Sequence, residues 1–112
     1  MSRVRVTYPS LGRSQVVEKL RQAHIRLRAK LPISRMILYG SYAKGRYTAG
    51  SDIDIVVVYD GPPRGDVYKL VMEEIELPRV EPKVYSKEQF DALVASSPKF
   101  AKALEKEGIP IL

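Results

Sequence analysis

The chain has 112 residues, of which 45% are hydrophobic and 29% are charged, and it contains no cysteine. This length and composition predict a single globular domain over residues 1–112, with one core and no room for a second. No apolar run approaches the roughly 18 residues of a membrane span, so we expect no membrane association. The absence of cysteine excludes disulfides and thiolate metal sites, and it fits a cytoplasmic protein.

The net charge of +6 favours polyanionic partners, namely nucleic acid, nucleotides or an acidic protein. Much of the basic excess lies within residues 13–35, where Glu18 is the single acidic residue. We interpret this segment as a solvated helix face. A nucleic-acid surface is the alternative, but no aromatic side chains interleave these charges as stacking platforms would.

The amino-terminal part predicts one helix. Residues 1–9 alternate apolar and basic side chains and indicate either an edge strand or a loose basic tail. Residues 14–31 place apolar side chains at helical spacing, with Ser14 as the expected N-cap and Pro32 just beyond the end. His24 lies beside this apolar stripe, and we interpret it as a packed helix residue and not as a catalytic one.

The middle of the chain predicts two buried strands and a helix. Residues 33–39 and the run that follows Asp52 are largely apolar, and a short helical turn is expected at residues 41–47. The run Asp60–Gly65 is rich in glycine and proline and breaks the chain. After it, Asp66 is expected to cap a helix that ends near Pro78.

The last third predicts a strand, two helices and a short final strand. Residues 80–85 are expected to form the third strand, in which Pro82 indicates a sheet edge or a bulge. Ser86 with Gln89 forms a capping box for the next helix, and Pro98 suits the first turn of the last one. Residues 109–112 predict a short edge strand.

Two carboxylates in the second strand need an explanation. Side chains alternate across a strand, so Asp52 and Asp54 point the same way, roughly 7 Å apart along the chain. Two carboxylates on one face of a core strand repel each other and lose hydration unless a positive charge lies between them. A pair of Mg²⁺ ions about 3.5–4 Å apart suits this spacing.

A second feature lies at the end of the first strand, where Gly40 precedes Ser41. Glycine lets the backbone approach a ligand closely, because no Cβ stands in the way. If a short helix begins here, its free N–H groups and the serine hydroxyl provide an anion site. A phosphate site on one strand and metal-binding carboxylates on the next would together hold a metal–triphosphate.

Gly40-Ser41, ten further residues and Asp52-x-Asp54 resemble the signature of the nucleotidyltransferase superfamily related to DNA polymerase beta. The short chain is similar to the minimal nucleotidyltransferases of prokaryotes, in particular the MntA-like antitoxin group. The resemblance implies an α/β fold with a small mixed sheet of three to five strands, backed by helices on one face. The other face would be open and carry the site, where the superfamily uses a third carboxylate. Glu81 falls where the superfamily commonly has an aspartate, and the alternative for it is a surface charge paired with Lys83.

The resemblance also implies site residues and chemistry. Asp52, Asp54 and Glu81 would be the metal-binding and catalytic groups, with two Mg²⁺ ions. Gly40 and Ser41 would bind the phosphates of the nucleotide, and we expect Lys44 or Arg46 to contact them as well. The alternative for these two basic residues is an exposed loop.

The implied reaction moves a nucleoside monophosphate, AMP from ATP, to a hydroxyl group. Members of the minimal group are paired with a small helical HEPN-type protein as antitoxins, so the leading hypothesis is AMP transfer onto such a partner. Two alternatives stay open. One is a non-catalytic antitoxin or binding module with a vestigial metal site, and the other is a nucleic-acid-directed nucleotidyltransferase, which we do not favour.

Overall fold

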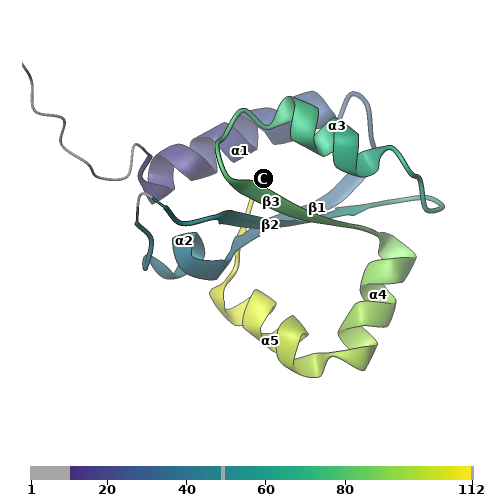
Figure 1. Ribbon diagram of the computed structural model, residues 1–112. Helices are drawn as coiled ribbons and strands as arrows, with labels where there is room; N and C mark the ends of the chain where they lie inside the picture. Colours follow the sequence, from purple (N-terminus) through teal and green to yellow (C-terminus); the bar gives the residue numbers. More distant parts are fainter. Residues whose placement is uncertain (1–10, 49, 112) are drawn as a thin grey trace, which may run out of the picture.

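The computed structural model describes residues 11–48 and 50–111 (Figure 1). In chain order its elements are α1 (Arg13–Leu27), β1 (Ile33–Tyr39), α2 (Gly40–Lys44), β2 (Ile53–Tyr59), α3 (Val67–Glu74), β3 (Val80–Ser86), α4 (Lys87–Ser96), α5 (Pro98–Glu107) and β4 (Ile109–Pro110). The predicted α/β class is confirmed. The strand or tail predicted at residues 1–9 lies outside the described residues.

The four strands form one mixed sheet, as predicted, and their order in it is β3-β2-β1-β4. Strand β1 is antiparallel to β2 and to β4, whereas β2 and β3 are parallel and α3 lies between them in the chain. The Ile53 N–H donates to the Arg79 carbonyl at 2.9 Å, so the backbone groups of Pro82 face away from β2. Pro82 therefore costs the sheet no hydrogen bond, and the predicted edge position is confirmed.

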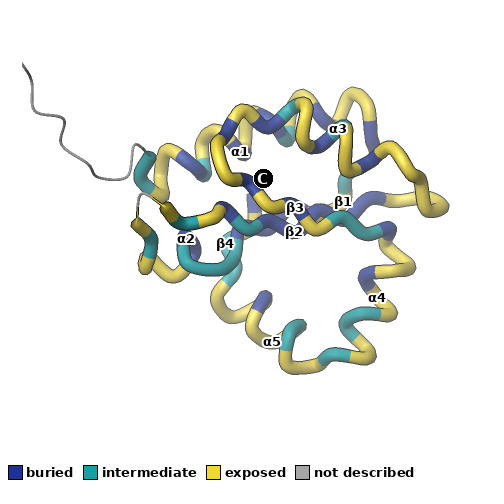
Figure 2. The backbone as a smooth tube through the Cα atoms, in the orientation of Figure 1, coloured by how far each residue is buried: buried dark blue, intermediate teal, exposed yellow. Residues whose placement is uncertain are grey.

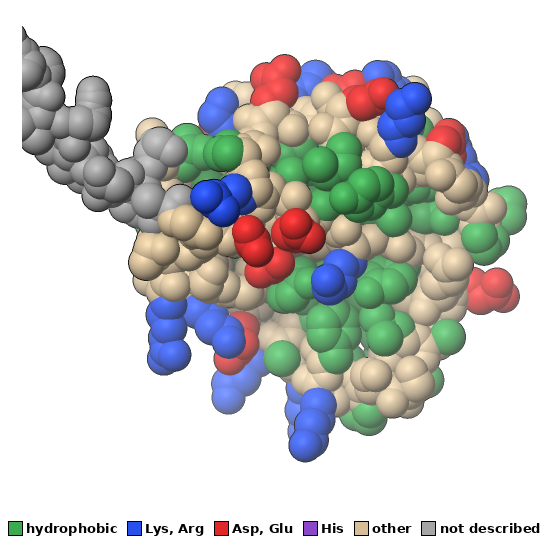
Figure 3. Space-filling view, viewed as in Figure 1, with side chains coloured by type: hydrophobic (Ala, Val, Ile, Leu, Met, Phe, Trp, Pro, Cys, Tyr) green, Lys and Arg blue, Asp and Glu red, His purple; other side chains and the backbone are tan. Residues whose placement is uncertain are grey.

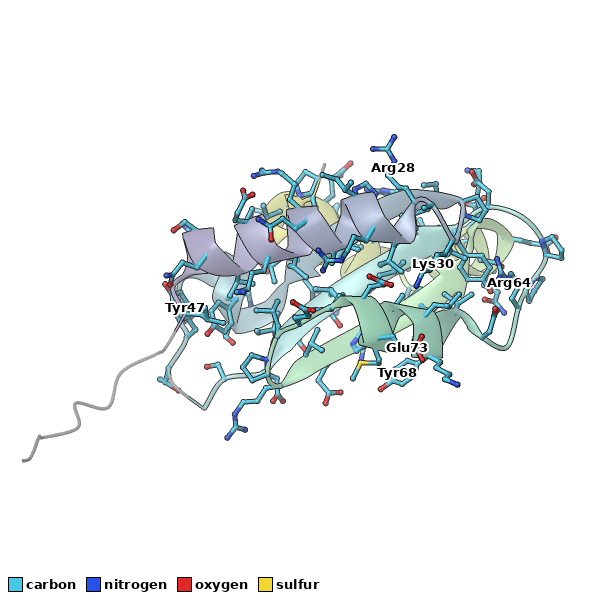
Figure 4. All side chains as sticks on the ribbon, turned by 90° about the horizontal axis from the view of Figure 1, so that it is seen from above. Arg28, Lys30, Tyr47, Arg64, Tyr68 and Glu73 are labelled. Atoms are coloured by element: carbon cyan, nitrogen blue, oxygen red, sulfur yellow. The ribbon has the colours of Figure 1, made fainter. Side chains whose placement is uncertain are left out.

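One face of the sheet is sealed by α1 and α3, which lie side by side across it (Figure 4). The β2 side chains on this face are Ile53, Ile55, Val57 and Tyr59, and all four are buried in the larger core cluster. Helix α1 contributes apolar residues at helical spacing to the same cluster, which are Val16, Leu20, Ala23 and Leu27.

The opposite face, which the prediction left open, is partly covered by α4 and α5 (Figures 1 and 2). A second core cluster forms here around Ile37, Val56, Val58, Phe90 and Leu104. The cover is incomplete. Along β2, Val56 and Val58 are buried, whereas Asp54 is half-buried and Asp52, just before the strand, is exposed. This end of the second face carries the polar side chains of the site.

Several helix ends follow the sequence signals, and others do not. Helix α4 begins with the predicted capping box, in which the Gln89 N–H donates to Ser86 Oγ at 3.1 Å. The N-cap predicted at Ser14 is wrong, because α1 begins at Arg13, with Gly12 as the N-cap. The Gly12 N–H donates a hydrogen bond to the Gln15 side chain at 2.7 Å, so a residue of the first helical turn pairs with the backbone N–H of the N-cap.

The helix after the glycine- and proline-rich break also differs in detail. Asp66 is at the N-cap position of α3 but makes no side-chain capping hydrogen bond. Its carboxylate accepts from the Arg64 guanidinium instead, at 3.0 and 2.8 Å, and this charge-assisted pair outcompetes the cap. Within the described part of the chain, none of the helices combines the length and apolar character needed to span a membrane.

Candidate nucleotide-binding site

The strand register brings three of the predicted site residues to one place. Asp54 on β2 pairs with Tyr39 on β1 and with Glu81 on β3, so the three side chains share the face covered by α4 and α5. Asp52 precedes β2 by one residue and is exposed, as is Glu81. In Figure 3, acidic side chains gather near the middle of the viewed face, with basic side chains on either side of them.

The electrostatics of this carboxylate cluster, Asp52, Asp54 and Glu81, show how closely its members interact. Burial raises the pKa of Asp54, the negative charges of Asp52 and Glu81 add to the rise, and the Lys83 ammonium opposes it. Burial, together with Asp54, Tyr85 and Glu81, raises the pKa of Tyr39 to about 12. The Tyr39 hydroxyl therefore stays protonated at neutral pH and can donate a hydrogen bond within this negative surrounding.

Gly40 is fixed by both its backbone and its neighbour. Its φ is +76°, in the left-handed region that side chains disfavour. A Cβ at this position would lie 2.4 Å from the Asp54 Oδ2, much closer than real Cβ contacts. The turn into α2 therefore requires glycine, and it packs the backbone directly against a carboxylate of the cluster. Ser41, half-buried, follows as the next residue of α2.

Lys44 and Arg46 lie at the other end of this short helix from Ser41. The Lys44 ammonium is 3.5 Å from the Glu107 carboxylate of α5, so α2 and α5 are joined at this point. Arg46 is exposed, and with Lys44 and Lys106 it lines a polar cavity of about 380 Å³. Basic side chains project from the lower part of the view in Figure 3, beneath α2 and along α5.

The donor set suits a hard divalent cation. Carboxylate oxygens are the ligands that Mg²⁺ prefers in proteins, and the cluster has an excess of negative charge that Lys83 only partly offsets. In residues 11–48 and 50–111, however, no three acidic or histidine side chains stand close enough together to hold one ion as they lie. The fit to a metal thus rests on the charge and the type of these groups.

The position of His24 agrees with the packed interpretation. It is half-buried on α1, and among the described residues its buried Nδ1 has no hydrogen-bond partner. Burial first, and then the charge of Arg28, lower its pKa. It does not line the cavities beside Gly40 and Lys44 and does not contribute to the charge around Asp54.

The sequence interpretation missed other residues near the cluster. Lys83 is not among them, because it is two residues after Glu81 and strand alternation alone places both on one face. Tyr39 directly precedes Gly40, and the sequence predicts it only as a strand residue. Phe100 lies edge-on to Tyr39, with ring centroids 6.2 Å apart, and no local signal links these two residues, which are far apart in the sequence.

Comparison with known proteins adds the family context. A model of the family described as "Nucleotidyltransferase domain" matches residues 17–110. Two proteins of Methanocaldococcus jannaschii, each described as a "Putative protein adenylyltransferase", are similar over shorter segments. The first is 61% identical over 28 residues, which are 25% of this chain and 28% of that protein. The second is 43% identical over 47 residues, or 42% of this chain and 47% of that protein. The matched segments therefore span less than half of each relative.

A solved structure is also similar in fold. The crystal structure of a protein described as a "putative nucleotidyltransferase" from Sulfolobus solfataricus superimposes with a TM-score of 0.60 and 19% sequence identity. The match covers 88% of this chain and 80% of that chain. At this identity the likeness concerns the fold alone, and it agrees with the mixed sheet and helices described above.

Proposed function

Because the chain belongs to the nucleotidyltransferase domain family, we propose that it transfers AMP from ATP to a hydroxyl group and releases pyrophosphate. The observation that carries this proposal is the register of Asp54 between Tyr39 and Glu81, beside a glycine that no other residue can replace without a clash. Two neighbouring strands thereby present carboxylates next to a backbone that a phosphate can approach closely.

Asp52 and Asp54, with Glu81 beside them, would hold two Mg²⁺ ions. The ions would supply charge neutralisation of the triphosphate and a lower pKa for the acceptor hydroxyl. In the transfer step, the hydroxyl oxygen bonds to the α-phosphorus and the bond from that phosphorus to the bridging oxygen breaks. Pyrophosphate leaves with the bonding electrons, and Glu81 assists in removing the hydroxyl proton.

The other predicted residues have supporting roles in this proposal. Gly40 and Ser41 bind the β- and γ-phosphates through backbone N–H groups and the serine hydroxyl. Lys44 and Arg46, which line the same polar cavity, attract the negative charge of the triphosphate. For Lys44 this role competes with its pairing to Glu107, so its contribution would be the smaller of the two.

For the acceptor, we propose a hydroxyl on a protein, and specifically on a small helical HEPN-type partner for which this chain acts as an MntA-like antitoxin. The support is the name given to the two relatives, protein adenylyltransferase, and the resemblance of the Gly-Ser and Asp-x-Asp segments to the minimal nucleotidyltransferases. With ATP as the donor and Mg²⁺ as the cofactor, we propose that the protein acts in the cytoplasm.

One observation favours a second candidate, a binding module that silences its partner by contact alone. Among the described residues, no three acidic or histidine side chains are already placed for one ion. If the cluster is vestigial, Asp54→Ala would still form the complex and silence the partner. Loss of silencing in a variant that still forms the complex would contradict the binding module and support catalysis.

The direct test is incubation with Mg²⁺ and α-labelled ATP, with and without the protein encoded by the neighbouring gene. We expect label on that protein and release of pyrophosphate, and both should disappear with Asp52→Asn. The matched control is Asp60→Asn, an equally exposed aspartate just past the other end of β2, which should retain transfer. Magnesium-dependent ATP binding without label on any hydroxyl would contradict the transferase and leave the binding module.

A further inference from the structure

A second cavity, of about 250 Å³, lies on the other side of the Lys44–Glu107 ion pair from the polar one. We call it the α5 pocket. Its wall combines the end of β1 with one side of α5, which contributes Phe100, Ala103 and Leu104. The rings of Tyr39 and Phe100 meet edge to face at an interplanar angle of 90°. The pocket is therefore mainly apolar and partly aromatic, unlike the neighbouring polar cavity.

The α5 pocket shares a wall with the carboxylate cluster. Tyr39 and Gly40 line it, Tyr39 is the strand partner of Asp54, and the Gly40 backbone packs against the Asp54 carboxylate. A molecule whose phosphates lie beside Gly40 can therefore extend its apolar part toward this pocket.

The rim of the pocket is polar. Glu107 is about half exposed, its side chain having a relative exposure of 44%, and Lys44 lies opposite it. An ionised carboxylate only accepts hydrogen bonds, and an ammonium only donates them. A flat ring bound in the pocket would therefore have the Glu107 carboxylate at the rim, and this carboxylate can accept a hydrogen bond from an amino group on the ring.

We propose that the α5 pocket binds the base of the nucleoside triphosphate and selects bases that carry an exocyclic amino group through Glu107. This inference rests on the proposed function, because it takes the nucleotide as the ligand of the adjoining cluster. Stacking on aromatic side chains is indifferent to base identity, since every base has a π-face, so affinity would come from Phe100 and Tyr39. Selectivity would come from Glu107, because its carboxylate can accept a hydrogen bond from an exocyclic amino group and gains no such bond from a base without one.

The first test compares ATP with inorganic tripolyphosphate, which has the phosphates without the base, by calorimetry in Mg²⁺. The wild type should bind ATP more tightly. Ala103→Phe fills the pocket from α5. It should lower the affinity for ATP by about tenfold and leave the affinity for tripolyphosphate unchanged. Ala101→Phe is the matched control, because Ala101 is on the same helix but lines the groove between α4 and α5. It should leave both affinities unchanged.

The outcomes distinguish failure of the pocket proposal from failure of the transferase proposal. Equal affinities for ATP and tripolyphosphate, or an Ala103→Phe variant that binds ATP normally, would overturn the pocket while the transferase proposal stands. A variant in which both affinities fall together has lost the site or the fold and would also count against the pocket. Failure of the wild type to bind either ligand would overturn both proposals.

The second test concerns the amino group and uses inosine triphosphate, which lacks it. The wild type should bind ATP about threefold to tenfold more tightly than inosine triphosphate. Glu107→Leu should abolish this ratio, and Glu105→Leu, on the same helix but lining the other groove, should preserve it. No discrimination by the wild type, or unchanged discrimination in Glu107→Leu, would remove the assignment of Glu107.

Discussion

The two faces of β2 differ although they are built from alternate residues of one seven-residue strand. Toward α1 and α3 the strand presents Ile53, Ile55 and Val57, all at most 2% exposed. Toward α4 and α5 it presents Asp54 first and only then Val56 and Val58. The first face is apolar along its whole length, whereas the second changes from polar to apolar along the strand.

This difference separates stability from chemistry. The apolar face gains free energy from removing large side chains from water, and any gap in it is costly. At its polar end the other face holds like charges beside one another. Their repulsion costs free energy in the folded protein, and a bound ligand of opposite charge offsets this cost. Neighbouring residues of β2 should therefore respond to substitution differently, the buried ones through stability and Asp54 through chemistry.

The largest difference between the two faces is expected when Ile55 is truncated and Asp54 is neutralised in separate variants. Ile55→Ala should lower the free energy of unfolding by about 2–5 kcal/mol, because Ile55 is fully buried. Asp54→Asn should leave stability nearly unchanged, since the Asp54 side chain accepts no hydrogen bond from the described residues, and should abolish nucleotidyl transfer. Denaturant unfolding and the label assay measure the two effects. Comparable destabilisation by both variants would mean that the two faces are not functionally distinct.

A smaller effect separates two glycines that border α2 and share a φ of +76°. Alanine at either position should cost about 1–2 kcal/mol, the penalty for a side chain in the left-handed region. Only Gly40→Ala should also lose nucleotide binding, because its Cβ would displace the Asp54 carboxylate. At Gly45 the nearest atom to a Cβ is the Arg13 Nη1, 3.6 Å away. Calorimetry with ATP tests this, and equal loss of binding in both variants would contradict it.

The smallest expected effect lies on the stabilising face, where Glu74 of α3 accepts hydrogen bonds from Lys30 and Arg26. Figure 4 shows Lys30 between the end of α1 and α3. These two cations lower the pKa of Glu74, with Lys30 as the larger cause. As the pH falls, the unfolded chain therefore protonates Glu74 before the folded chain does. The stability that ionised Glu74 contributes is complete above the usual carboxyl pKa, and it is lost as the pH falls through the lowered pKa.

Glu74→Gln should accordingly reduce the acid dependence of stability below about pH 4.5, the ordinary range of a glutamate pKa. The control is Glu73→Gln on the same helix, whose carboxylate is 4.0 Å from Lys69 of that helix. Thermal unfolding at several pH values measures both variants. An identical pH dependence in the two would show that the link between α1 and α3 does not contribute.

Much of the fold was predictable because its signals are local. Apolar runs fixed the strands, Pro82 indicated the sheet edge, and Ser86 with Gln89 started α4 as expected. The family match confirms the nucleotidyltransferase class that the Gly-Ser and Asp-x-Asp spacing indicated. The roles of Asp52, Asp54, Glu81, Gly40, Ser41, Lys44 and Arg46 stay predictions. Gly12 replaces Ser14 as the N-cap of α1, and its N–H donates to the Gln15 side chain. Asp66 is at the predicted N-cap position of α3, but its carboxylate pairs with Arg64 and not with the backbone.

The sequence alone determined which residues share a strand face, since alternation depends only on the order of the residues. It therefore predicted Asp52 and Asp54 on one face, although β2 begins only at Ile53, and it indicated Gly40 as a point of close approach. Only the tertiary structure decided that Glu81 lies beside Asp54 and that α5 folds back against α2 to form a pocket next to them. Strand order and helix docking depend on the burial of residues far apart in the chain, and no local pattern records them.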